Sequence, residues 1–247
     1  MNKNTELTVT GFANLAEFNM NEVLAEELEG LDSGFERIKI PSAGSTVFEV
    51  PSDDPSEPDA VKEFSAVILY HHPLYAFYES KYTGGNQPPD CGSYDGITGT
   101  GTPAGDCSTC PNNQFGSGEN GSKACKNRRR IYVLREGEIF PMILSLPTGS
   151  LKEYSRYIKR LLSKGKKSNS VVTKFSLKKV TNSSGIAYSQ AQFAVDRVLT
   201  QEELSLISNL SLQVKAYSKN IGFDADHAEE EAPMIDMETG EVIEPLK

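Results

Sequence analysis

Apolar and polar residues alternate along much of the chain, which predicts a protein built largely from antiparallel strands. Strand-like alternation occupies residues 35–40 and 46–50, around the turn-forming residues 41–44. A loop rich in Pro, Asp and Ser follows at 51–59. Residues 64–72 (FSAVILYHH) and 74–82 (LYAFYESKY) flank Pro73 and are predicted to form two adjacent strands.

The second half of the chain predicts two more strand pairs and two helices. Residues 129–135 should pair with 139–146, and residues 171–180 with 186–199. A helix over 151–163 has Ser150 as its predicted cap, an apolar face and a Lys- and Arg-rich face. A further helix begins after Thr200, with Glu203 completing a capping box, and runs to about Ser218.

The order of these elements is that of the OB-fold, whose helix lies between the third and fourth strands. We therefore expect an α+β protein with an OB-fold-like antiparallel barrel, and another small antiparallel α+β fold is the alternative. Residues 1–34 are predicted to be an acidic arm, which is either mobile or carries a docking helix at 15–31. Residues 35–221 form the core, with an insertion at 84–128, and residues 222–247 an acidic, disordered tail.

All four cysteines lie in the predicted insertion. Cys107 and Cys110 form a C-x2-C pair, and Cys91 and Cys125 stand about fifteen residues to either side. Four thiolates suit a structural Zn²⁺ site, and the Gly-, Asn- and Ser-rich sequence between them has little apolar surface to hold one shape without a metal. Two disulfides, or four unrelated thiols, are the alternatives.

The first residues of the chain show no basic segment followed by an apolar segment and a small-residue cleavage site. Disulfides persist in oxidising compartments, so a cytoplasmic chain with reduced thiols is the expectation. No apolar run approaches the roughly 20 residues that span a bilayer, and no membrane association is predicted.

Charge is strongly segregated, although the net charge is −9 and the isoelectric point is near 5.0. Between residues 123 and 179, sixteen Lys and Arg face three Glu, a net charge of +13. The rest of the chain therefore carries −22. The basic segment 123–179 could therefore bind a polyanion, whereas the acidic segments on either side of it could not.

Five segments carry a resemblance to a known family: VILYHHP (67–73), GGNQPPDC (84–91), CSTCPNNQFGSG (107–118), KACKNRRRIYVL (123–134) and LPTGSLKEY (146–154). They make residues 35–199 similar to a family of phage and prophage proteins of replication and recombination cassettes, which look like single-stranded-DNA-binding proteins. The resemblance implies that the protein acts in the cytoplasm of a bacterial host. More distantly, zinc inserted into an OB barrel is similar to the zinc-bearing OB domain of eukaryotic replication protein A and to zinc-containing helix-destabilising proteins of large phages.

Binding of single strands requires cations for the phosphates and aromatic faces for the bases. Alternation in residues 129–135 puts Arg130 and Tyr132 on one face, where a base could stack beside a phosphate. Lys164, Lys166 and Lys167 are expected in a loop that adds to the same positive field. The predicted DNA-binding residues are Lys81, Tyr82, Lys123, Lys126, Arg128, Arg129, Arg130, Tyr132, Arg135, Tyr75, Phe77, Tyr94 and Phe115. Any one tyrosine could instead be a core aromatic, and the 126–130 cluster a solvated charge run.

The expected function is non-sequence-specific binding of single-stranded DNA in phage or prophage replication or recombination, without enzymatic activity or catalytic residues. An alternative is a zinc-containing interaction module that binds replication or recombination proteins, for example through the acidic tail. A nuclease is disfavoured because Asp90, Asp95 and Asp106 occupy turn-forming sequence. His71 and His72 are explained by the strand that contains them.

Overall fold

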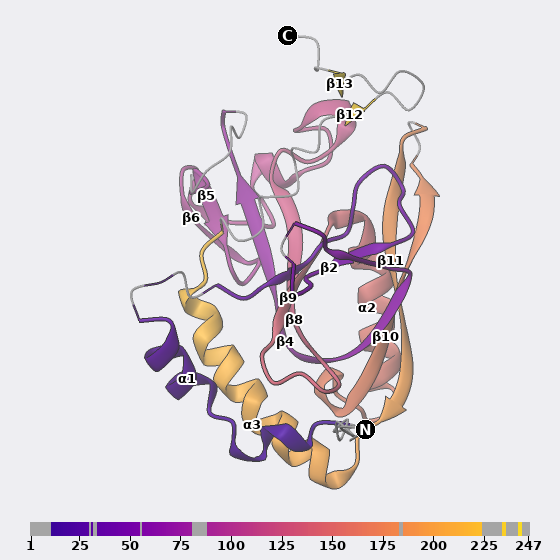
Figure 1. The fold of residues 1–247 in the computed structure, drawn as a ribbon. Coiled ribbons are helices and arrows are strands. Elements are labelled where there is room, and N and C mark those ends of the chain that lie inside the picture. Colours follow the sequence, from indigo (N-terminus) through magenta and orange to yellow (C-terminus); the bar gives the residue numbers. More distant parts are fainter. Residues whose placement is uncertain are drawn as a thin grey trace.

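The computed structural model describes residues 11–29, 31, 34–54, 56–80, 88–182 and 185–223, together with two short strands of the C-terminal segment. It is an α+β protein, as predicted, with a mixed nine-stranded sheet (Figure 1). Its α-helices are α1 (Met20–Glu27), α2 (Thr148–Leu162) and α3 (Gln201–Tyr217). None of the described helices is long and apolar enough to cross a membrane.

Strand β4 (Glu63–Phe77) is the centre of the sheet and its longest member. Strand β8 (Lys126–Arg135) runs antiparallel along one edge of β4. The other edge is shared: β10 (Val171–Thr181) pairs with its first residues, and β5 (Cys91–Ser93) with its last. The cysteine-bearing segment therefore leaves the end of β4 and returns as β8, which places it between two strands of the sheet, as the sequence predicts.

The remaining strands extend the sheet on both sides. Beyond β8 lie β9 (Met142–Leu146) and then β1 (Arg37–Ile38), which is parallel to β9. Strand β10 pairs with β11 (Ala187–Val198), and β5 is followed by β6 (Thr98–Gly101) and β7 (Gly105–Asp106). Separate small sheets are formed by β2 (Phe48–Val50) with β3 (Asp59–Val61), and by β12 (Met234–Ile235) with β13 (Val242–Ile243). The 3-10 turns are η1 (Ala13–Glu17), η2 (Pro111–Asn113), η3 (Glu119–Gly121), η4 (Ser168–Ser170) and η5 (Ser218–Asn220).

Pro73 does not separate two strands, contrary to the prediction, because β4 continues through it. Pairing with β10 ends at Val67 and pairing with β5 begins at Tyr75, so Pro73 lies where that edge of β4 has no partner strand among the described residues. Proline is tolerated in a strand where its missing N–H costs no ladder hydrogen bond. The prediction failed because it treated Pro73 as a chain break without knowing which edge would be paired.

A closed barrel is not found in the described part of the chain. The closing pair would join β9 to β11, but the outer edge of β9 is occupied by β1. The predicted strand-like segments at 35–40 and 46–50 meet at one antiparallel bridge, between Lys39 and Glu49, whereas their longer pairings are of β1 with β9 and of β2 with β3. Strand edges are paired by segments that lie far apart in the sequence, and the local alternation of apolar and polar residues does not show which segments these are.

Both faces of the sheet are covered, and this creates two hydrophobic cores. Ile131 and Val133 of β8 point into the core beneath α2. Tyr132 and Leu134 point into the core beneath α3. In Figure 1, α2 and α3 lie on different sides of the central strands. Strand β8 is therefore buried on both faces, which an alternation of two apolar rows permits.

The N-terminal helix belongs to the second core. Met20 is fully buried and its backbone N–H donates to Oε1 of Gln213 in α3 at 2.9 Å. Leu24 is also buried in this core. Of the two possibilities that the sequence left open, a mobile arm and a docking helix, the structure shows a helix packed beside α3 (Figure 1).

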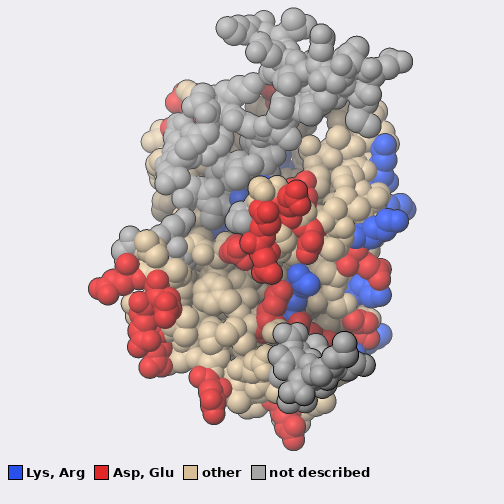
Figure 2. All heavy atoms as spheres, in the orientation of Figure 1, with Lys and Arg blue, Asp and Glu red and all other residues tan. Residues whose placement is uncertain are grey.

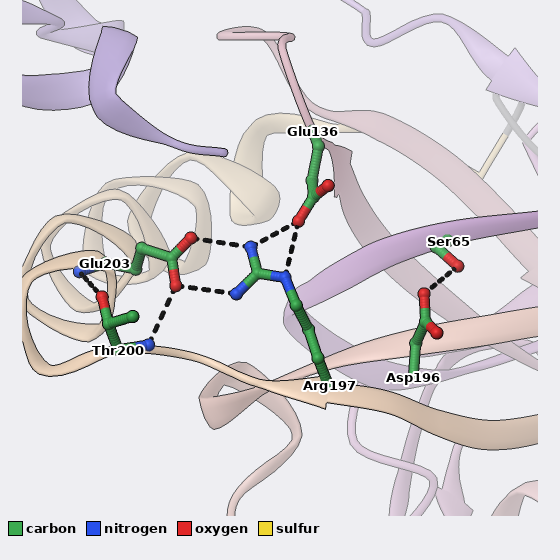
Figure 3. Close-up of polar contacts among 6 residues, drawn as sticks. All are labelled: Ser65, Glu136, Asp196, Arg197, Thr200 and Glu203. Carbon is green, nitrogen blue, oxygen red and sulfur yellow. Dashed lines mark hydrogen bonds and ion pairs between the residues drawn. The ribbon is translucent and has the colours of Figure 1, made fainter. Parts of the chain in front are cut away.

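The start of α3 is held by a polar cluster (Figure 3). The predicted capping box is confirmed: the Glu203 backbone N–H donates to Thr200 Oγ1 at 3.2 Å, and Thr200 N–H donates to Glu203 Oε2 at 2.9 Å. Arg197 of β11 donates to both carboxylate oxygens of Glu203 at 2.7 and 2.8 Å. It also donates from Nε to Glu136, in the turn after β8, at 2.8 Å. Hydrogen bonds from Arg197 lower the pKa of Glu203 to about 2.

Helix α2 begins at Thr148, slightly before the predicted start, and Ser150 lies inside it. The Ser150 hydroxyl is buried and accepts a hydrogen bond from Ala191 N–H at 2.9 Å, so it joins α2 to β11 instead of capping the helix.

Charge is segregated on the surface too. Figure 2 shows Asp and Glu on the side of α1 and across the middle of this face, and most of its Lys and Arg along the opposite edge, on the side of β10 and β11, where some acidic residues lie among them.

Candidate cysteine site and nucleic-acid interface

All four cysteines line one small cavity between β5, β6 and the start of β8. The cavity has a volume of about 20 Å³, enough for a single water-sized sphere. Gly99 is part of its wall: a Cβ atom on Gly99 would lie 2.9 Å from Cys91 Sγ and 3.8 Å from Cys107 Sγ. The absence of a side chain there leaves open a space that two thiols share.

The thiols are close enough to affect one another electrostatically. Burial, together with the negative charge of the other three cysteines, raises the pKa of Cys125 to about 12. Burial and the neighbouring Cys107 and Cys110 likewise raise the pKa of Cys91. All four are free thiols, so the disulfide alternative is not seen. Among the described residues, no three His, Cys, Asp or Glu side chains already form a coordination shell. Convergence on one cavity is shown, and zinc binding stays a prediction.

Asn113, which the sequence did not single out, fixes the C-x2-C turn. Its side-chain amide donates to the carbonyl oxygen of Cys107 at 2.6 Å, and its backbone N–H donates to that of Cys110 at 3.0 Å. Lys123 Nζ donates to Asn113 Oδ1 at 3.1 Å. Lys123 was predicted to contact DNA, and in the structure it is also tied to this turn. An Asn three residues after the C-x2-C pair is the sequence signal that could have found it.

Tyr75 and Phe77 line the cysteine cavity. Both were predicted as base-stacking residues, and both are half-buried. Their rings supply the apolar wall of the cavity from the end of β4. The structure therefore gives them a packing role next to the thiols.

Phe115 and Lys123 form the most exposed aromatic and cation pair of the cysteine segment. The ring of Phe115 is 77% exposed, and Lys123 Nζ lies 5.1 Å from its centroid. Single exposed apolar side chains are common on protein surfaces, so the exposure makes this ring accessible to a partner without requiring one. Of the predicted stacking residues that the structure describes, Phe115 is the most exposed.

The basic strand β8 divides its cations between different surroundings. Lys126 is exposed, and Arg128 is half-buried. Arg129 donates from Nη1 to His71 Nδ1 at 2.6 Å and lies over the ring of Tyr154 at 5.8 Å. Burial and the positive charge of Arg129 lower the pKa of His71 to about 4, so its imidazole is neutral and can accept this bond.

At the far end of the strand, Arg135 forms an ion pair with Glu138 at 3.5 Å. About two fifths of the Arg135 side chain is exposed. Glu138 is more enclosed, because its Oε2 is buried and burial raises the pKa of its carboxyl group. The exposed part of Arg135 can still contact an anion.

Arg130 and Tyr132 are fully buried, which corrects the idea of a solvent-facing Tyr beside an Arg. Arg130 donates from Nη1 to the carbonyl oxygen of Ile221 at 3.2 Å and from Nη2 to that of Gly222 at 2.6 Å. The ring of Tyr132 packs edge-on against Phe35 with centroids 5.6 Å apart. Neither side chain has a surface available to DNA in this structure, because α3 and the chain after it cover that face of β8.

Tyr94 is 40% exposed but is partly covered by the same C-terminal segment. Its ring lies 4.3 Å from that of Phe223, and its hydroxyl donates to the carbonyl oxygen of Ile221 at 3.3 Å. Phe223 also packs over Gly92, where a Cβ atom would lie 2.4 Å from its ring. The acidic C-terminal segment thus starts from the surface of the cysteine element. Lys81, Tyr82 and most of the tail lie outside the described residues.

The three carboxylates near the cysteines bind local donors. Asp95 Oδ1 accepts from the N–H groups of Ile97 and Thr98 at 2.7 and 2.8 Å. Asp106 accepts from Ser108 N–H at 2.7 Å, and Asp90 from Glu79 N–H at 2.7 Å. Asp90 and Asp95 lie in bends, as predicted, whereas Asp106 is the last residue of β7 and holds the turn that follows it.

No known protein-family profile matches the chain, and no curated protein or solved structure matches it significantly. The resemblance to phage and prophage single-stranded-DNA-binding proteins therefore stays a prediction. Function must be argued from the surfaces described above.

Proposed function

We propose that this protein binds single-stranded DNA without sequence preference, as a non-enzymatic component of phage or prophage replication or recombination. The observation that carries the proposal is the surface of the cysteine element. Exposed Phe115 offers a face for a base, Lys123 lies beside it, and Lys126 and Arg128 follow on the strand that leaves the element. Cations beside an open aromatic ring suit a phosphate next to its base.

A structural Zn²⁺ would be held by Cys91, Cys107, Cys110 and Cys125. The shared cavity, the space left by Gly99 and the thiol-only donor set support this, because four thiolates are a typical ligand set of structural zinc. The ion would replace the thiol protons and fix the segment that carries Phe115. Its role would be to order a polar loop that has little apolar surface of its own.

We also propose that the sheet is an open variant of the OB type. Strands β4, β8 and β9 follow one another, α2 comes next, and β10 and β11 return with β10 against β4. This is the connectivity of an OB barrel without its closing strand pair. Proteins of this type bind single strands across their strands and loops.

A protein-interaction module remains the second candidate, and one observation favours it. The C-terminal segment is anchored at Ile221 and Phe223 and then continues into acidic sequence, in which β12 and β13 pair apolar residues. Apolar anchors among carboxylates suit a partner protein with a basic, apolar surface. A replication or recombination protein would then bind the tail.

Fluorescence anisotropy with labelled single- and double-stranded oligonucleotides tests the main proposal. We expect preference for the single strand, and a log–log salt dependence with a slope of about −0.7 per phosphate contacted. A salt-insensitive titration, or equal binding of duplex, would overturn it. A variant lacking residues 224–247, which keeps the Phe223 anchor, separates the two candidates. DNA affinity should persist or rise if the protein binds DNA itself, whereas only partner capture should vanish if it is an interaction module.

A further inference from the structure

A groove of about 330 Å³ lies between the C-terminal end of α2 and β4. Its floor is apolar and comes from Leu69 of β4 with Ile158 and Leu161 of α2. Its rim is polar and contains Tyr70 and His71 on one side and residues 166–169 on the other. The groove follows the stretch of β4 between Val67 and Tyr75, where neither β10 nor β5 is paired.

The charge of the groove is positive. Two of its lining residues, Lys166 and Lys167, are cationic, and none is Asp or Glu. Lys215 of α3 does not line the groove, although its Nζ lies 6.0 Å from the ring of Tyr70. A second groove of similar size, about 290 Å³, has three carboxylates (Glu36, Glu49 and Asp54) against two cations (Arg37 and Lys39), a net charge of −1. Of these two grooves, only the first complements an anion.

From this we propose that the α2–β4 groove holds one nucleotide of the bound single strand, with its base on the apolar floor and its phosphate at Lys166 and Lys167. The inference rests on the proposed function and assigns part of that function to a surface away from the cysteines. A volume near 330 Å³ is at the small end of ligand pockets, which suits a single nucleotide. Ser168 and Asn169 supply hydroxyl and amide groups that can bond the edge of any base.

The groove is continuous with the basic strand. His71 on its rim accepts the hydrogen bond of Arg129, which belongs to the run that follows Cys125. Along β4, His71 and the cavity-lining Phe77 are about 20 Å apart by the rise of an extended strand. A single strand that reached both places would cover several nucleotides, within the range of about 4 to 16 known for OB-type proteins.

An extended peptide that adds to the unpaired edge of β4 is the competing occupant. The lysines favour the nucleotide, because main-chain pairing alone requires no cations. The test therefore uses the lysines and a direct map of the contact.

The experiment compares two double variants of the full chain by anisotropy with a thymidine oligonucleotide of about 16 residues. Lys166→Gln with Lys167→Gln changes the groove. Lys178→Gln with Lys179→Gln removes an equal charge from exposed positions that lie about 20 Å along β10 from its first residues. We expect the salt slope to fall by about 0.7 in the groove variant only, the value for one lost phosphate contact. Photocrosslinking of the same oligonucleotide carrying 5-iodouracil should label Tyr70 or His71.

Each other result contradicts the inference. Equal losses in the two double variants would mean a general effect of charge. Crosslinks confined to the cysteine element would show that the oligonucleotide does not enter the groove, which would then favour a peptide as its occupant. The proposed function would still stand. If the unmodified protein fails to bind the oligonucleotide at all, the proposed function and this inference both fall.

Discussion

Arg130 donates a 2.6 Å hydrogen bond to the carbonyl oxygen of Gly222, joining the centre of the basic strand to the start of the acidic C-terminal segment. The guanidinium is completely buried, so this is an internal contact and not a surface one. A cluster that looks like a DNA-binding run in the sequence thus contains one cation that serves the fold.

Replacing Arg130 with Met should lower the free energy of unfolding by about 3 kcal/mol, because two buried carbonyl groups lose hydrogen bonds from a charged donor. Urea unfolding followed by circular dichroism measures this. The control is Lys126→Met, an exposed position on the same strand, which should change stability by no more than about 0.5 kcal/mol. Equal effects of the two changes would show that Arg130 is not buried as described.

Phe115→Ala should weaken single-strand binding by about 1–3 kcal/mol, the usual value of one base stacked on an aromatic ring. Its stability should change little, since the ring is 77% exposed. Anisotropy and thermal unfolding measure the two quantities. Ile97→Ala, at a 67% exposed apolar position of the same element, should alter neither. A loss of affinity with Ile97→Ala as large as that with Phe115→Ala would argue against specific stacking.

Glu203 forms the salt bridge to Arg197 and part of the capping box of α3. Its replacement should therefore lower the free energy of unfolding by an amount that depends on pH. Glu203→Gln should cost about 1–2 kcal/mol at neutral pH, from weakened bonds to Arg197 and Thr200. The pKa of Glu203 is lowered from 4.5 to about 2, so the folded state favours the ionised form. Its contribution is therefore complete above about pH 4.5 and disappears as the pH falls towards 2.

Chemical denaturation at several pH values measures this difference. Glu202→Gln is the matched control, because it removes the same charge from the same helical turn at an exposed position. Glu202→Gln should lower the free energy of unfolding at neutral pH by less than Glu203→Gln does. A Glu203→Gln cost that stays constant down to pH 2 would rule out the ionised carboxylate as its origin.

Gly92→Ala should displace the ring of Phe223, because the added Cβ would lie 2.4 Å from it. We expect a cost of about 1–3 kcal/mol from overpacking. In a Phe223→Ala background the same change should cost much less, giving a coupling energy of at least about 1 kcal/mol. A coupling near zero would mean that Phe223 does not rest on Gly92 in solution.

The protein purified without chelator should contain about one zinc ion per chain, bound by thiolates. Cys107→Ser or Cys125→Ser should reduce that content and weaken DNA binding with it. Inductively coupled plasma mass spectrometry measures the metal, and Ser108→Ala, between the paired cysteines, is the control. Full zinc content in both cysteine variants would refute a site at this cavity.

Sequence patterns predicted the elements whose signals are local. The hairpin of β10 and β11, the capping box of α3 and the insertion of the cysteine segment between two strands all appear as expected. Each depends on alternation, turn residues or a cap within a few positions of the element itself. The four cysteines also line one cavity, whereas zinc binding there stays a prediction.

Tertiary structure alone decided which faces and edges of the strands remained available. Tyr132 and Arg130 could not be recognised as buried, because the helix and chain segment that cover them come from about 70 to 90 residues later. Pro73 looked like a break because its unpaired edge is defined by where β10 and β5 stop. Lys166 and Lys167 were visible as a basic loop, but only the packing of α2 against β4 places them on a groove. Alternation thus fixes which residues share a strand face, whereas burial depends on the distant segments that cover it.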